Sequence, residues 1–103
     1  MSTGNRAATA ILVTADAAIG TSGASILVYA VTLLNGTADA SINLRNGTSA
    51  TATSLWKLGI VLNATAEVTS ISQTFPKPIA FPSGCFADIT GTAAVAYVAY
   101  APA

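Results

Sequence analysis

The stretch that decides the fold runs from Ala38 to Gly47 and reads Ala-Asp-Ala-Ser-Ile-Asn-Leu-Arg-Asn-Gly. Its apolar residues occupy every second position, at Ala38, Ala40, Ile42 and Leu44, and polar residues fill the positions between them. This two-residue period predicts a β-strand with one buried and one solvated face, because successive side chains leave opposite sides of the pleat. The closing Asn-Gly pair tolerates positive φ and predicts a turn.

The same pattern of a short apolar run followed by a turn recurs along the chain. We expect strands over residues 7–15, 25–34, 38–45, 54–62, 65–75, 85–90 and 93–100, and loops over 16–25 and 47–53. Turns at roughly ten-residue spacing predict an all-β fold, a single antiparallel β-sandwich or jelly-roll-like domain of seven to eight short strands. Only Asn35-Gly36 and Thr37 separate the second and third strands, which are expected to form a hairpin.

Two segments carry further signals. The strand at 25–34 is apolar on both faces, with Ile26, Val28 and Ala30 on one side and Leu27, Tyr29, Val31 and Leu33 on the other. Such a strand is covered on both sides, in a core or at an interface. Prolines 76, 78 and 82 exclude a central strand because proline has no ladder donor, so residues 75–82 are expected at an edge or at a crossing between sheets.

The composition describes a folded chain with an unusual surface. Of its 103 residues, 52% are hydrophobic and only 8% are charged, against a usual charged share of about 25%. We expect a mobile N-terminal segment at residues 1–6 and one β-sandwich domain at 7–103. Soluble monomers normally keep charges on exposed strand edges. The scarcity of charge therefore indicates that neighbouring molecules cover much of this surface.

Several classes of partner are disfavoured. The formal net charge is zero and basic residues do not cluster, so we expect neither nucleic acid nor an anionic membrane surface as a partner. A membrane-spanning helix needs about 20 consecutive apolar residues, and the longest apolar runs reach roughly half of that length.

Catalytic chemistry has few candidates. The chain has no histidine, one cysteine and four carboxylates, so it lacks the partners for a Ser-His or Cys-His pair and for histidine zinc sites. We therefore expect no enzyme activity, no cofactor and no catalytic, cofactor-binding or metal-binding residue. Cys85 is interpreted as a small buried hydrophobe, and Asp39 and Asp88 as solvated or turn-supporting residues.

The large aromatic residues leave two interpretations open. Tyr29, Trp56, Tyr97 and Tyr100 could form a platform on which sugar rings stack. The interpretation we favour is that they pack in the core and at interfaces, where Tyr and Trp bury area and keep one polar contact.

The segments 75–79 and 83–92, which read Phe-Pro-Lys-Pro-Ile and Ser-Gly-Cys-Phe-Ala-Asp-Ile-Thr-Gly-Thr, carry a resemblance. Together with Leu-Arg-Asn-Gly-Thr at 44–48 and Leu-Trp-Lys-Leu at 55–58, they resemble small β-rich virion proteins of tailed bacteriophages, of the capsid decoration or cement type. The match covers about residues 26–100. Its motifs mark turns and core, so no binding residue is carried over, and Gly84-Cys85-Phe86 departs mildly from the Gly-aromatic step of the pattern.

The resemblance implies a structural virion protein on the outer surface of the capsid. Such a protein binds the major capsid protein and stabilises the head shell as a homo-oligomer, for which a homotrimer is expected. Residues 1–10 are then expected to lie against the shell. Two alternatives stay open: another virion component, such as a head fibre, vertex or tail module, and a small carbohydrate-binding or adhesin-like β-sandwich.

Overall fold

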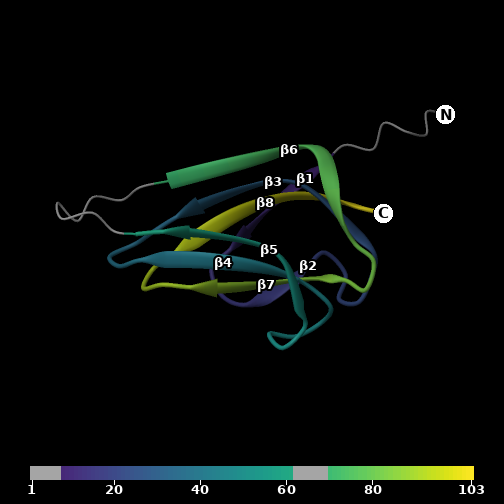
Figure 1. Ribbon diagram of the computed structural model, residues 1–103, viewed down its shortest axis with the longest axis horizontal. Helices are drawn as coiled ribbons and strands as arrows, with labels where there is room; N and C mark the ends of the chain where they lie inside the picture. Colours follow the sequence, from purple (N-terminus) through teal and green to yellow (C-terminus); the bar gives the residue numbers. More distant parts are fainter. Residues whose placement is uncertain (1–7, 62–69) are drawn as a thin grey trace.

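The chain folds into two antiparallel sheets. The computed structural model describes residues 8–61 and 70–103, none of which lies in a helix. The strands are β1 (Thr9–Val13), β2 (Ala17–Ile19), β3 (Ile26–Leu34), β4 (Ala40–Asn46), β5 (Thr53–Ile60), β6 (Ser70–Phe81), β7 (Cys85–Thr90) and β8 (Val95–Pro102) (Figure 1). The expected all-β class with seven to eight strands is confirmed.

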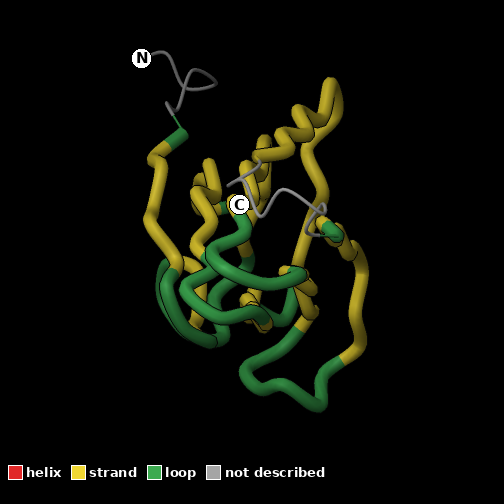
Figure 2. Tube along the Cα trace, turned by 90° about the vertical axis from the view of Figure 1, so that its left-hand side faces the viewer, coloured by secondary structure: helices red, strands yellow, loops and turns green. Residues whose placement is uncertain are grey.

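The strand order defines the topology. One sheet has the order β1-β8-β3-β6 and the other has the order β2-β7-β4-β5, and we call them sheet A and sheet B. This is the strand order of an eight-stranded jelly roll, in which the chain passes repeatedly between two facing sheets. Loops gather at the ends of the strands (Figure 2).

The core fills the space between the sheets. Its buried members from sheet A are Val13, Ile26, Val28, Val31, Leu33, Phe81, Ala96 and Val98, and those from sheet B include Ile19, Ala40, Ile42, Leu44, Ile60, Cys85 and Ala87. The two-residue period of the opening stretch is thus confirmed over β4, because Ala40, Ile42 and Leu44 all point into the core. Ala38 and Asp39 lie in the loop before that strand. Asp39 is exposed, as expected, but its expected placement on the strand is wrong.

The expected hairpin between the second and third predicted strands is wrong. β3 lies inside sheet A, where β6 and β8 occupy both of its edges, whereas β4 belongs to sheet B. Residues 35–39 instead cross between the sheets, with Asn35 buried and the Thr37 N–H donating to the Thr92 carbonyl at 3.2 Å. The Asn-Gly pair predicts only that the chain turns. The sheet that the next strand joins depends on its pairing partners, which for β4 are β5 and β7.

A β-bulge in β3 overturns the simple alternation expected there. The register with both neighbouring strands shifts between Val28 and Ala30. Val31 and Leu33 therefore share the buried face with Ile26 and Val28, instead of pointing away from them. The extra residue at the bulge is Tyr29. Beyond such a bulge, each side chain points to the opposite face of the sheet from the one that simple alternation predicts.

The N-terminal part differs from expectation at one further point. The predicted loop at 16–25 contains β2, whose three residues pair with β7 and whose Ile19 is fully buried. Three small or apolar residues are too few to show the alternation that indicates a strand. The segment becomes a strand because its backbone pairs with β7, which lies far away in sequence. The expected segment 1–6, and residues 7, 62 and 65–69 of the expected strands, lie outside the described residues.

The proline-rich segment belongs to the edge strand β6, as expected. Ile79 pairs with Val28 and Thr74 pairs with Ala30, so residues 75–78 leave the ladder opposite a single residue of β3. Pro76 and Pro78 lie in this excursion, where no ladder donor is required. Phe75, at its start, contacts Trp56 of β5 edge-to-face, with ring centroids 5.3 Å apart, and so links the edges of the two sheets.

Candidate interaction surfaces

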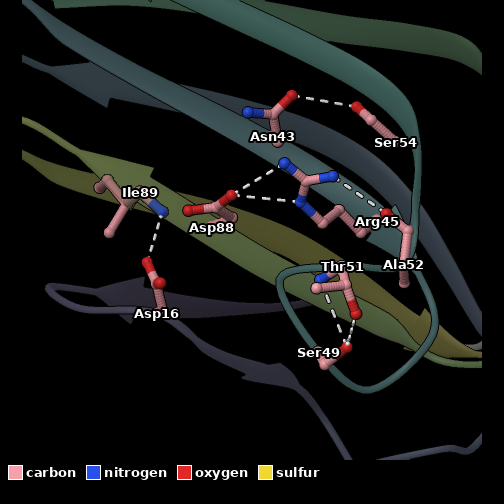
Figure 3. A network of polar contacts seen from close by, with 9 residues as sticks. All are labelled: Asp16, Asn43, Arg45, Ser49, Thr51, Ala52, Ser54, Asp88 and Ile89. Carbon is pink, nitrogen blue, oxygen red and sulfur yellow. Dashed lines mark hydrogen bonds and ion pairs between the residues drawn. The ribbon is translucent and has the colours of Figure 1, made fainter.

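The outer face of sheet B carries a polar network centred on Arg45 (Figure 3). Its Nε and Nη2 atoms donate to Asp88 Oδ2 at 3.1 and 3.0 Å, and its Nη1 donates to the Ala52 carbonyl at 2.9 Å. The guanidinium therefore ties β4 to β7 and also holds the loop before β5. Charge-assisted bonds of this kind are among the stronger ones in proteins.

Neighbouring polar groups extend this network. Asn43 Oδ1 accepts from Ser54 Oγ at 3.0 Å, and Asp16 Oδ1 accepts from the Ile89 N–H at 2.8 Å (Figure 3). Asp88 is thus an ion-pair partner on a strand, which the interpretation from sequence missed. Its partner could not be identified from sequence because Arg45 lies 43 positions away and the β4–β7 pairing is not visible in the chain.

The outer face of sheet A has the opposite character. One row across the sheet consists of Leu12, Tyr97, Thr32 and Ser72, which lie opposite one another on β1, β8, β3 and β6. The next rows contribute Ala10, Ala30 and Ala99 on one side and Leu34 and Val95 on the other. We call these nine residues the uncharged face. Leu12 is 51% exposed and Tyr97 is 48% exposed, so two large apolar side chains lie open at its centre.

Charge is therefore segregated between the two sheets. Among the described residues, Arg45, Lys57 and Asp88 lie on strands of sheet B, and Asp16 and Asp39 lie in loops. Lys77 is the one charged residue that the described strands of sheet A contain, and it lies in the excursion of β6. The two outer faces of the sandwich therefore differ in chemistry: the face of sheet B carries charged side chains, and the nine residues of the uncharged face carry none.

The four large aromatic residues considered for a sugar-binding platform lie in different parts of the structure. Trp56 and Tyr100 pack against the core, and Tyr100 also lies against the backbone of Gly20. Tyr97 stands on the uncharged face, and Tyr29 is half-buried at the bulge of β3. Trp56 and Tyr97 belong to different sheets and different faces, so a platform built from all four is not assembled.

Cys85 is buried, as expected, and lies next to Ile19 across the β2–β7 ladder. Burial raises the pKa of its thiol from 9.0 to about 12, because the interior disfavours the thiolate. Over residues 8–61 and 70–103 we find no pocket and no group of three side chains arranged to hold a metal ion. No helix in that part of the chain is long and apolar enough to span a membrane.

Comparison of the chain with protein-family models, curated proteins and solved structures gives no match. The surfaces described above are therefore interpreted from their own chemistry. The sequence indicated from composition that an uncharged surface exists. It did not locate that surface on β1, β8, β3 and β6, because its members come from four segments that the topology brings together.

Proposed function

We propose that this chain is a structural virion protein of the capsid decoration type, which binds the outer surface of a phage head through the uncharged face of sheet A. The observation that carries the proposal is the segregation of charge between the two sheets. A surface centred on Leu12 and Tyr97, with no charged side chain among its nine residues, suits broad apolar contact with a protein lattice.

The architecture is compatible with this role. Jelly rolls recur in viral capsid domains and in lectin domains, so the fold agrees with the proposal and does not by itself choose a function. The resemblance of residues 26–100 to small phage virion proteins supplies the choice among these roles.

Binding to heads tests the proposal directly. Heads are purified from the phage that encodes the chain, stripped of this protein, and sedimented with increasing amounts of the recombinant chain. We expect saturation at a fixed ratio to the major capsid protein and little change between low and high salt, because an uncharged contact is not screened. Failure to sediment with heads contradicts the proposal.

Matched variants identify the binding face. Tyr97→Asp places a charge in the centre of the uncharged face, and Thr90→Asp adds the same charge to an exposed position of β7 in sheet B. We expect Tyr97→Asp to weaken head binding at least about tenfold, since a buried unpaired charge is costly. Thr90→Asp should bind as the unmodified chain does. The opposite pattern would move the binding face to sheet B.

A further inference from the structure

Each sheet has two edge strands, and the four edges are not equally protected. Edge strands expose unpaired N–H and C=O groups, and natural proteins block them with short length, proline, charge or bulges. In sheet A the edges are β1 and β6, and in sheet B they are β2 and β5.

Three of these edges carry blocking features. β2 is only three residues long. β5 carries the exposed Lys57, and its ladder with β4 is irregular between Leu44 and Arg45. β6 has Pro76 and Pro78, with four residues outside the ladder. Each of these features makes pairing with another chain unfavourable.

β1 has none of them. It reads Thr-Ala-Ile-Leu-Val, pairs with β8 in a regular register over all five residues, and contains neither proline nor charge. It lies at the outer margin of the body (Figure 2). A regular edge of this kind, without charge or proline, is a template for another strand.

We propose that two copies of this chain associate through the edge of β1 that faces away from β8, antiparallel across a twofold axis. No strand among residues 8–61 and 70–103 pairs with this edge, and we call it the free edge. Their sheets A then join into one continuous sheet, and the uncharged faces of the two copies become a single surface. This inference deepens the proposed function and rests on it for its purpose, because a doubled face offers a lattice twice the contact.

The sequence of β1 suits pairing with itself. In a register centred on Ile11, the cross-strand pairs are Ile11 with Ile11, Ala10 with Leu12, and Thr9 with Val13. All are apolar or β-branched combinations, which are favourable on a pleated surface, and no like charges face each other. Leu12 and Ala10 lie on the outer side, so pairing extends the row of Leu12 and Tyr97 without a break.

Twofold pairing is an alternative to the homotrimer expected from sequence. In a threefold ring each copy uses two different patches, whereas a strand that pairs with its own copy uses one patch on both partners. The edge of β1 spans five residues and buries a modest area on pairing, so we expect an association at the weak end of specific interfaces.

Light scattering on a sizing column tests the inference without heads. The unmodified chain should move from its monomer mass of 10.2 kDa to twice that value as its concentration rises to about 1 mM, a range that reveals even millimolar dissociation constants. A monomer throughout, or a trimer, overturns the proposal.

A pair of variants locates the contact. Ala10→Lys with Leu12→Lys brings lysines opposite each other twice in the paired edge, and should weaken dimerisation at least about tenfold, with partial recovery at about 1 M salt. Thr53→Lys with Leu55→Lys adds the same charge to exposed positions of β5 and should leave the dimer intact. If the first variant dimerises normally, the edge assignment is wrong.

If the lysine variant folds poorly, hydrogen exchange of the unmodified chain tests whether β1 forms the dimer contact. In the unmodified chain, the amides of residues 9–13 that face away from β8 should exchange more slowly at high than at low concentration. Equal rates, together with a dimer mass, would overturn the assignment to β1. A dimer that does not bind heads contradicts the proposed function alone, and head binding by a constant monomer contradicts this inference alone.

Discussion

Leu12 on β1 and Tyr97 on β8 lie directly opposite each other, and about half of each side chain is exposed. This pair stands on the outer face of sheet A, where the neighbouring side chains are alanine, threonine, leucine and valine. The arrangement joins the free edge of β1 to the centre of the uncharged face. The proposals on function and on self-association both depend on this surface.

The exposed and the packed aromatic residues should respond differently to substitution. Tyr97→Ala removes a half-exposed ring from the outer face, and we expect it to lower the free energy of unfolding by less than about 1 kcal/mol. Trp56→Ala removes a ring that packs against the core and against Phe75, and should cost about 3 kcal/mol. Urea unfolding followed by circular dichroism measures both. Equal losses would contradict the placement of the two rings.

Three glycines close one end of the sandwich and should be intolerant of a side chain. Gly84 has φ +106°, and a Cβ there would lie 3.0 Å from the backbone N and Cα of Gly23 and 3.1 Å from the carbonyl O of Gly47. The Gly47 N–H also donates to the Gly84 carbonyl at 3.0 Å. We expect Gly84→Ala to destabilise the fold by at least about 2 kcal/mol.

Gly59 in β5 provides the control for this prediction. A Cβ at Gly59 would meet nothing closer than 3.6 Å, and the residue needs no left-handed backbone. Gly59→Ala should therefore leave the urea midpoint unchanged or raise it, because alanine loses less entropy on folding. A loss at Gly59 equal to that at Gly84 would contradict the close contact between the loops.

The ion pair of sheet B should show measurable coupling. Arg45 and Asp88 are each about one-fifth exposed, with side-chain values of 21% and 20%, and their closest atoms are 3.0 Å apart. We expect Asp88→Asn to cost about 1 kcal/mol, and Arg45→Met to cost more because it also breaks the bond to the Ala52 carbonyl. A double-mutant cycle should give a coupling of about 0.5–1 kcal/mol, reduced by salt. Additive losses would show that the pair does not contribute.

Cys85 should make the protein less stable in alkali. The pKa of its thiol is about 12 in the folded chain and 9.0 ordinarily, so above pH 9 the unfolded state loses a proton that the folded state keeps. Stability from this group is fully present below pH 9 and falls by up to about 1.4 kcal/mol per pH unit above it. Urea unfolding of the native chain and of Cys85→Ala at pH 8 and pH 10 isolates this effect. Parallel pH dependence in the two proteins would contradict the deep burial of the thiol.

Local pattern predicted much of this fold, and the failures have physical causes. The alternation over residues 40–45 and the prolines of residues 75–82 each reflect a local constraint, and β4 and β6 agree with what they predicted. The bulge at Tyr29, the crossing at residues 35–39 and the short β2 depend on partners distant in sequence. The same holds for the Arg45–Asp88 pair. Composition indicated an uncharged surface, but only the strand order places Leu12 beside Tyr97.

Hydroxyl-radical footprinting tests the central claim most directly. The chain is oxidised briefly when dilute, when concentrated and when bound to heads, and modification is measured residue by residue. We predict that Leu12 and Tyr97 lose reactivity on head binding, and that Leu12 already loses some in the concentrated protein. Leu55, which is 44% exposed on β5, should react equally in all three states. Protection of Leu55 with Leu12 and Tyr97 unchanged would contradict the account, because it would place the contact surface on sheet B.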